Sequence, residues 1–67
     1  MSTFHKRLKT LREDRGLSIR ELGEELNIDK SSLHRWETGR VMAKGDVLLI
    51  LADFFEVSVD YLLGAEE

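Results

Sequence analysis

"LNIDKSSLHRWETGR", residues 26–40, predicts the end of one helix, a tight turn and a short second helix. Asn27 suits the turn because asparagine tolerates a positive φ better than most residues. Asp29 is a favourable N-cap for the second helix, and Gly39 is the residue type that most often follows a helix end. This stretch therefore predicts a helix, a turn of about three residues and a further helix.

The second helix of this stretch has two different sides. Leu33 and Trp36, three residues apart, predict its buried side. Trp36 offers a stacking surface for single-stranded nucleic acid, but its spacing from Leu33 favours a place in the core. The polar residues left outside are Lys30, Ser31, His34, Arg35 and Thr38. Such a face suits a ligand with many hydrogen-bond acceptors, although it is also typical of an ordinary solvated helix.

The residues before this stretch predict the first of the two paired helices. Ser18 and Glu21 have the spacing of a capping box, and Leu17 with Leu22 has the spacing of a hydrophobic staple. This helix is expected to begin at Ser18 and to end near Leu26. Gly23 supplies a small residue where two helices approach closely. The helix-turn-helix unit is therefore expected at about residues 18–38.

Three further helices are expected on either side of this unit. Phe4, Leu8 and Leu11 form one apolar stripe of a helix at about residues 3–15. The segment VLLILADFF, residues 47–55, is apolar nearly all round, which predicts a helix buried on most faces or shared with a partner. Ser58 begins a last short helix. The expected fold is thus all-α.

Length and composition exclude several classes of protein. Sixty-seven residues make one domain, expected to span residues 1–67. The chain has no Cys and no apolar run of the ~18 residues that a membrane span requires, so we expect a cytoplasmic protein without membrane contact. His5 and His34 stand apart from any ligand cluster, so no metal is expected. No phosphate loop or catalytic triad pattern appears, so neither an enzyme nor a cofactor is expected.

The formal charge of −3 is unevenly distributed along the chain. Residues 1–15 carry five basic and two acidic residues, giving +3, and residues 16–44 balance five against five. Residues 45–67 carry six acidic residues and no basic residue, giving −6. A chain divided in this way can present a neutral-to-basic face to a polyanion and an acidic face elsewhere.

The order and spacing of these segments resemble one known family. "RLKTLREDRGLSIRELGEELNIDKSSLHRWETGR", followed by "LLILADFFEVSVDYLLG", is similar to the phage-repressor-like Cro/C1-type (XRE-type) helix-turn-helix domain. The resemblance covers about residues 4–64. It implies a compact five-helix, lambda-repressor-like domain whose second and third helices bind DNA. It also implies a homodimer on a palindromic double-stranded DNA operator.

The resemblance also implies roles for individual residues. The positions that relatives direct at base edges in the major groove correspond to Lys30, Ser31, His34 and Arg35. Flanking or phosphate-contacting positions correspond to Arg20, Asp29, Thr38, Arg40 and Lys44. A largely structural ion pair between the first and third helices corresponds to Arg12 and Glu37.

The sequence departs from the family pattern at two places near the DNA-binding unit. Relatives usually have a phosphate-contacting Gln where this chain has Ile19, so that contact is expected to be lost or to move to Arg20. The following loop usually carries basic residues and Pro-Ser-Leu, but here it reads VMAKG, residues 41–45. Val41 and Met42 are therefore expected either to be exposed or to fold inward in place of the missing Leu.

Two classes of function remain open. The first is a sequence-specific transcriptional regulator of the repressor type, with its third helix in the major groove. The second is a protein-interaction module of the same fold, similar to an antitoxin or antirepressor partner. Ile50, Val41 and Met42 are the candidates for self-association or for a protein partner. A Cro-like protein and the amino-terminal domain of a longer repressor are both compatible with the pattern.

Overall fold

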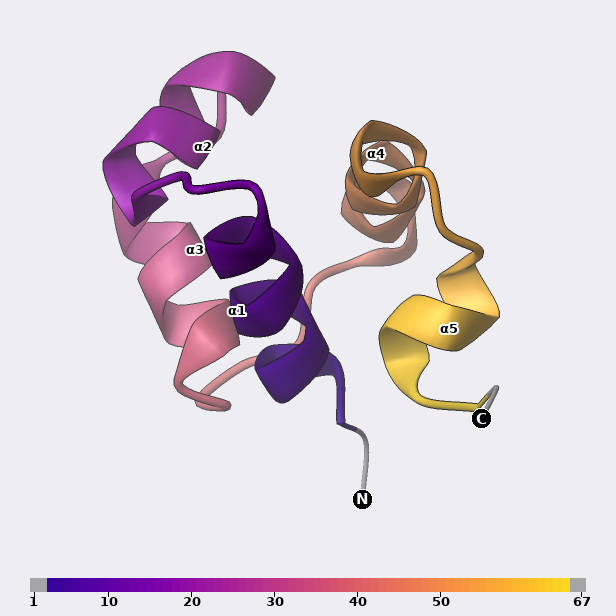
Figure 1. Cartoon of the computed structure of the whole chain (residues 1–67). Helices are drawn as coiled ribbons and strands as arrows, with labels where there is room; N and C mark the ends of the chain where they lie inside the picture. The colour runs from indigo at the N-terminus through magenta and orange to yellow at the C-terminus, as the bar shows by residue number, and fades with distance from the viewer. Residues whose placement is uncertain (1–2, 66–67) are drawn as a thin grey trace.

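The computed structural model describes residues 3–65 and contains five helices in that part of the chain. They are α1 (Phe4–Asp14), α2 (Ile19–Leu26), α3 (Lys30–Glu37), α4 (Gly45–Phe55) and α5 (Val59–Leu63) (Figure 1). The described residues form no strand, and the expected all-α, five-helix fold is confirmed. Four terminal residues of the expected domain, 1–2 and 66–67, lie outside the described part.

The helix-turn-helix unit begins and ends as the sequence predicts. The Ser18 hydroxyl accepts a hydrogen bond from the Glu21 N–H, and the Glu21 carboxylate accepts one from the Ser18 N–H, completing the capping box. Asn27 adopts φ 56° and ψ 44°, the left-handed conformation expected of it. The Asp29 carboxylate caps α3 by accepting from the Ser32 N–H at 3.2 Å. Local residues thus fix where α2 begins and ends and where α3 begins.

Helix α4 begins two residues before the expected position, at Gly45 instead of Val47. Its N-cap, Lys44, makes no side-chain capping hydrogen bond, so no recognisable start signal precedes the helix. Helix α4 ends at Phe55, followed by Glu56 with φ 58°, a conformation that glycine adopts more readily. Ser58 then caps α5 through the Tyr61 N–H at 2.9 Å, as expected.

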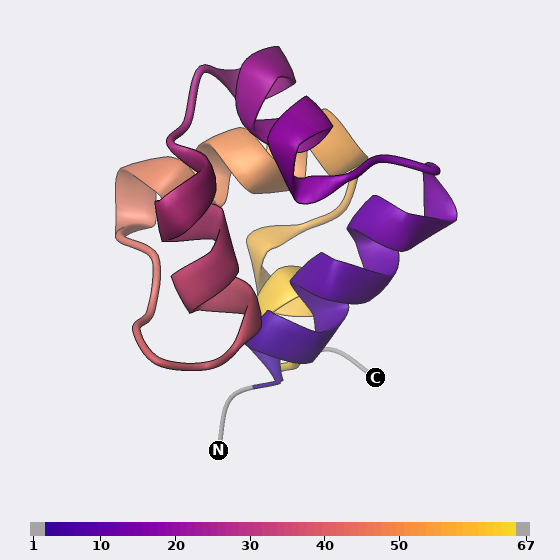
Figure 2. The same ribbon diagram turned by 90° about the vertical axis from the view of Figure 1, so that its left-hand side faces the viewer.

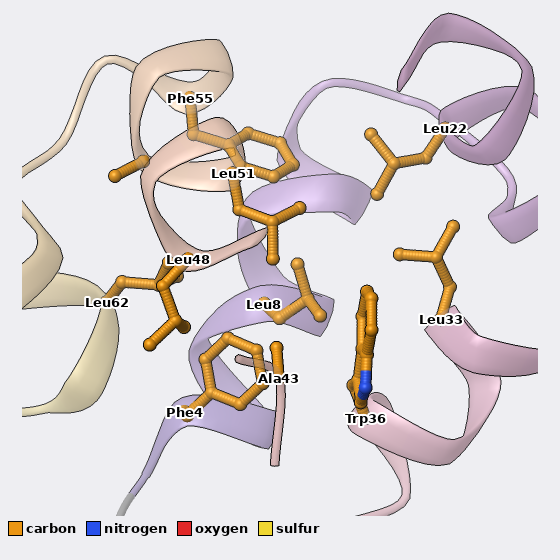
Figure 3. Packing of buried hydrophobic residues seen from close by; sticks show 11 residues of the cluster. Phe4, Leu8, Leu22, Leu33, Trp36, Ala43, Leu48, Leu51, Phe55 and Leu62 are labelled. Atoms are coloured by element: carbon orange, nitrogen blue, oxygen red, sulfur yellow. The ribbon is translucent and has the colours of Figure 1, made fainter. Parts of the chain in front are cut away.

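The hydrophobic core lies between α1, α3, α4 and α5 and reaches α2 through Leu22 (Figure 3). The largest fully buried side chains are Phe4, Leu8, Leu22, Leu33, Leu51 and Leu62. Trp36 is only 9% exposed, which confirms its predicted place in the core. Its indole lies beside Leu33 and faces Leu8 (Figure 3). The tryptophan therefore anchors α3 and is not a stacking surface for bases.

Gly23 allows α2 and the turn before α3 to pack closely. A Cβ atom added at Gly23 would lie 2.6 Å from the backbone oxygen of Ile28, closer than real Cβ contacts allow. The Ile28 N–H also donates to the Gly23 carbonyl at 2.9 Å. The predicted close approach is therefore present, and a side chain at this position would push the turn away from α2.

The two halves of the chain occupy different sides of the molecule. In Figure 1, α2 and α3 lie on the left, α1 in the middle, and α4 with α5 on the right. Figure 2, seen from that left side, has α1, α2 and α3 in front of α4. A large ligand on the outer face of α3 would consequently leave the outer face of α4 open.

Candidate nucleic-acid interface

The outward face of α3 is polar and exposed along its whole length. The four residues predicted to contact bases, Lys30, Ser31, His34 and Arg35, are all exposed. The opposite side of the same helix is buried and consists of Leu33, Trp36 and Glu37. Because the buried side is fixed in the core, the exposed donors are presented from a rigid helix. Rigid placement is what base-edge recognition requires.

Five of the predicted contact residues line one shallow surface hollow. This hollow has a volume of about 450 Å³, and its lining residues are Ile19, Lys30, Ser31, His34, Arg35 and Arg40. The lining comes from the start of α2, from α3 and from the loop after α3. The structure thus brings together all four base-contact candidates and one phosphate-contact candidate. Its three Lys and Arg side chains favour a ligand with negative charge.

Arg12 and Glu37 form the ion pair that the resemblance implies. The Arg12 Nε donates to Glu37 Oε2 at 2.7 Å, and its second terminal nitrogen donates to Oε1 at 2.9 Å. A third guanidinium hydrogen bond, of 2.7 Å, reaches the carbonyl of Leu17. Hydrogen bonding to Glu37 raises the pKa of Arg12 above its ordinary value, against the opposing effect of burial. Both residues are buried, so Glu37 belongs to the scaffold between α1 and α3.

The flanking candidates are exposed but have different surroundings. Arg20 forms a solvent-exposed ion pair with Glu24 at 3.4 Å, and such pairs hold a side chain weakly. The Thr38 hydroxyl donates to the carbonyl of Arg35 at 3.1 Å. Asp29 serves as the N-cap of α3, and Lys44 stands at the N-cap position of α4, away from the hollow lining.

Ile19 is the lining residue that reasoning from the sequence placed least well. It is the first residue of α2, is half-buried and packs against the core. Its side chain nevertheless contributes to the hollow shared with Lys30 and Arg35. The resemblance implied that a phosphate-binding side chain is missing at this position, whereas the place of Ile19 beside Lys30 and Arg35 depends on how α2 crosses α3.

The loop after α3 exposes apolar side chains. Val41 is 47% exposed and Met42 is 46% exposed, so the alternative in which both fold inward is wrong. Ala43, at 6% exposed, belongs to the core instead. Val41 and Met42 line a second hollow of about 230 Å³ together with Trp36 and Arg40. The hollow on the α3 face and this second hollow are thus neighbours, since Arg40 lines both of them.

The outer face of α4 differs in charge from the outer face of α3. Leu49 is 64% exposed and Ile50 is 46% exposed. The exposed acidic residues Asp46 and Asp53 lie within one helical turn of them. No basic residue belongs to α4. The expected division of charge is therefore also a division in space, and the acidic helices lie away from α3 (Figure 1).

The described residues contain neither a candidate metal site nor a helix that could span a membrane. Within residues 3–65, no group of three His, Cys, Asp or Glu side chains is placed to hold a metal ion. In the same residues, no helix has the length and apolar character needed to cross a membrane.

Comparison with known proteins gives one consistent result. A family model described as helix-turn-helix matches residues 8–62. The HTH-type transcriptional regulator ImmR of Bacillus subtilis is 40% identical over 62 residues, which are 92% of this chain and 49% of that protein. The HTH-type transcriptional activator BcrR of Enterococcus faecalis is 31% identical over 64 residues, which are 96% of this chain and 31% of that protein. The chain spans from about a third to half of the length of these relatives.

A solved structure shares the same arrangement of helices. The crystal structure of a transcriptional regulator from Listeria innocua superposes with a TM-score of 0.87 at 26% sequence identity. The match covers 96% of this chain and 60% of that chain. The fold described above is therefore shared with a solved transcriptional regulator.

Proposed function

The chain belongs to the Cro/C1-type helix-turn-helix family of DNA-binding transcription regulators, and we propose that it binds double-stranded DNA sequence-specifically with α3 in the major groove. The observation that carries this proposal is the exposed row of donors on α3. Lys30, Ser31, His34 and Arg35 stand on one side of a helix whose other side is fixed in the core.

Each of these four side chains matches groups on base edges. Arg35 and Lys30 suit the O6 and N7 acceptors of guanine, Ser31 suits several edges, and His34 suits a base or a phosphate. A good bidentate contact discriminates against the wrong base by about 1–3 kcal/mol. Two or three such contacts give modest specificity in one half-site. A homodimer on a palindromic operator doubles them, and we include this dimer in the proposal.

Contacts to phosphate set the position of the domain on DNA. Arg40 lines the hollow beside the base-contact residues, and Lys44 is exposed at the start of α4. Arg20 is exposed at the start of α2, and its ion pair with Glu24 is too solvated to compete strongly with a phosphate. We assign these three side chains to the DNA backbone.

Repression in the cytoplasm is the form of regulation that we propose. A domain bound in the major groove competes with other proteins for that stretch of DNA, so DNA binding alone is sufficient for repression when the operator overlaps a promoter. The relatives are longer than this chain, and the name of one of them, BcrR, describes an activator. We therefore propose repression separately from DNA binding, because the direction of regulation can depend on parts of a longer protein outside this domain.

Selection from a random double-stranded DNA pool tests the proposal. We expect a palindromic sequence to be enriched, with half-sites about 34–36 Å apart when the two copies contact the same face. We also expect affinity to fall steeply and log-linearly with salt, as counterions are released from phosphates. A selection that enriches no sequence, or an affinity for DNA that does not change with salt, would overturn the proposal.

A second candidate function is supported by exposed apolar side chains. Val41, Met42 and Ile50 are each nearly half exposed, and they lie outside the row of donors on α3. Monomeric proteins rarely leave large apolar patches uncovered. We therefore also propose that these residues bind a second copy or a protein partner, which is compatible with DNA binding through α3.

A further inference from the structure

The hollow on the α3 face contains a single apolar side chain. Of its six lining residues, five carry polar or charged groups and only Ile19 is a hydrocarbon. The Ser18–Glu21 capping box fixes the backbone directly beside Ile19. The half-buried side chain also packs against the core, so its position in the hollow is constrained from two sides.

Lys30, Ser31, His34, Arg35 and Arg40 supply hydrogen-bond donors, which match the acceptors of bases and phosphates. The hydrocarbon side chain of Ile19 can neither accept nor donate a hydrogen bond, so this side chain does not match a phosphate. The major groove presents one exposed apolar group, the C5-methyl of thymine. A surface with one apolar residue among donors is therefore complementary to a thymine beside acceptor-rich bases.

We infer that Ile19 is a specificity-determining residue that contacts a thymine C5-methyl group in each half-site. The inference rests on the proposed function, because it requires α3 in the major groove. It adds a contact from α2 to the reading done by α3.

The size of the expected effect follows from the burial of one methyl group. Burying a single carbon of this kind changes affinity by about fourfold. Replacing one thymidine by deoxyuridine removes the methyl and leaves every hydrogen-bonding atom of the base in place. We therefore expect about fourfold weaker binding when the contacted thymidine of one half-site is replaced. Replacement in both half-sites should weaken binding about sixteenfold.

The experiment is a deoxyuridine scan of the sequence obtained by selection. Each thymidine is replaced in turn, and binding to the wild-type protein, to Ile19→Ala and to Ile19→Gln is measured at fixed salt. Val59→Ala is the matched control, since Val59 is the first residue of α5, is half-buried against the core as Ile19 is, and lies outside the hollow. Circular dichroism establishes that each variant is folded at the assay temperature.

In the wild type and in Val59→Ala, replacing one particular thymidine in each half-site should lower the affinity about fourfold. In Ile19→Ala and Ile19→Gln, replacing that same thymidine should leave the affinity unchanged. A wild-type scan without any loss overturns the inference, and this result does not depend on whether the variants fold. A loss that persists in both Ile19 variants also overturns it, as does an Ile19→Ala defect that is equal on all DNA sequences. In these cases specific binding remains and the proposed function stands, whereas failure to select any sequence overturns both.

Discussion

Helices α3 and α4 both expose one long face, and the two faces have opposite chemistry. The exposed face of α3 carries donors and positive charge, and its apolar residues are all buried. The exposed face of α4 carries Leu49 and Ile50 between Asp46 and Asp53. An acidic, apolar face is repelled by DNA, whereas the α3 face attracts it. In a domain of 67 residues, the surface that we propose for DNA therefore differs from the surface that we propose for protein contact.

The largest expected effect comes from removing the buried ion pair between Arg12 and Glu37, which connects α3 to α1. Arg12→Met leaves the Glu37 carboxylate buried without its partner, and such losses cost about 3–5 kcal/mol. A domain of this size is stabilised by only a few kcal/mol, so we expect the variant to be largely unfolded at 25 °C. Urea denaturation followed by circular dichroism measures the change in the free energy of unfolding.

Arg20→Met is the matched control for this experiment. Its ion pair with Glu24 is exposed, with 78% and 68% of the two side chains accessible, so the change should remain within about 0.5 kcal/mol. Adding Glu37→Leu to Arg12→Met should recover most of the lost stability, because no unpaired charge remains buried. Equal effects of Arg12→Met and Arg20→Met would contradict the structural role of the buried pair.

A smaller effect is expected where α2 meets the turn before α3. Gly23→Ala places a Cβ atom 2.6 Å from the Ile28 carbonyl oxygen, and backbone must move to relieve the contact. We expect a loss of about 1–3 kcal/mol in the free energy of unfolding. Gly45→Ala, with no atom within 4 Å of the added Cβ, should be neutral or stabilise by up to about 1 kcal/mol. A lower melting temperature for Gly45→Ala than for Gly23→Ala would contradict the close approach of Gly23 to the Ile28 carbonyl.

The smallest expected effect is on self-association, and it tests the proposal that the exposed face of α4 contacts protein. Ile50→Lys places a charge in the exposed apolar patch and should weaken self-association without changing the fold. Sedimentation velocity over a range of concentrations measures this change. Thr10→Lys, on the exposed side of α1, introduces the same charge and should leave the monomer–dimer profile unchanged. Identical profiles for wild type and Ile50→Lys would remove Ile50 from the interface.

The sequence predicted the helix-turn-helix unit well because each of its boundaries depends on neighbouring residues. Ser18 with Glu21, Asn27 and Asp29 act through hydrogen bonds or backbone preferences within a few residues. The start of α4 was misplaced because Lys44 caps nothing with its side chain. Whether the apolar residues of α4 are buried depends on packing between distant segments, which local pattern does not determine.

The candidate site was predictable in its parts but not in its arrangement. Periodicity alone placed Lys30, Ser31, His34 and Arg35 outside, and the structure has all four exposed. Local pattern left two alternatives for Val41 and Met42, and the burial of Ala43 in their place depends on the path of the loop. The presence of Ile19 in the hollow depends on how α2 crosses α3, so it emerged only from the three-dimensional structure.

The measurement that tests the central claim most directly is the affinity of Arg35→Ala for a selected operator and for a scrambled duplex. Arg35 is exposed, and its side-chain contact with Ser32 is a weak 3.4 Å hydrogen bond, so the variant should fold normally. Lys9→Ala, on the exposed side of α1, is the matched loss of one positive charge. We predict that Arg35→Ala lowers the affinity for the operator by about 30-fold or more and changes the affinity for the scrambled duplex little. Lys9→Ala should lower the affinity for each of the two duplexes by less than about threefold. Operator binding by Arg35→Ala that equals binding by Lys9→Ala would contradict the assignment of α3 as the DNA-reading helix.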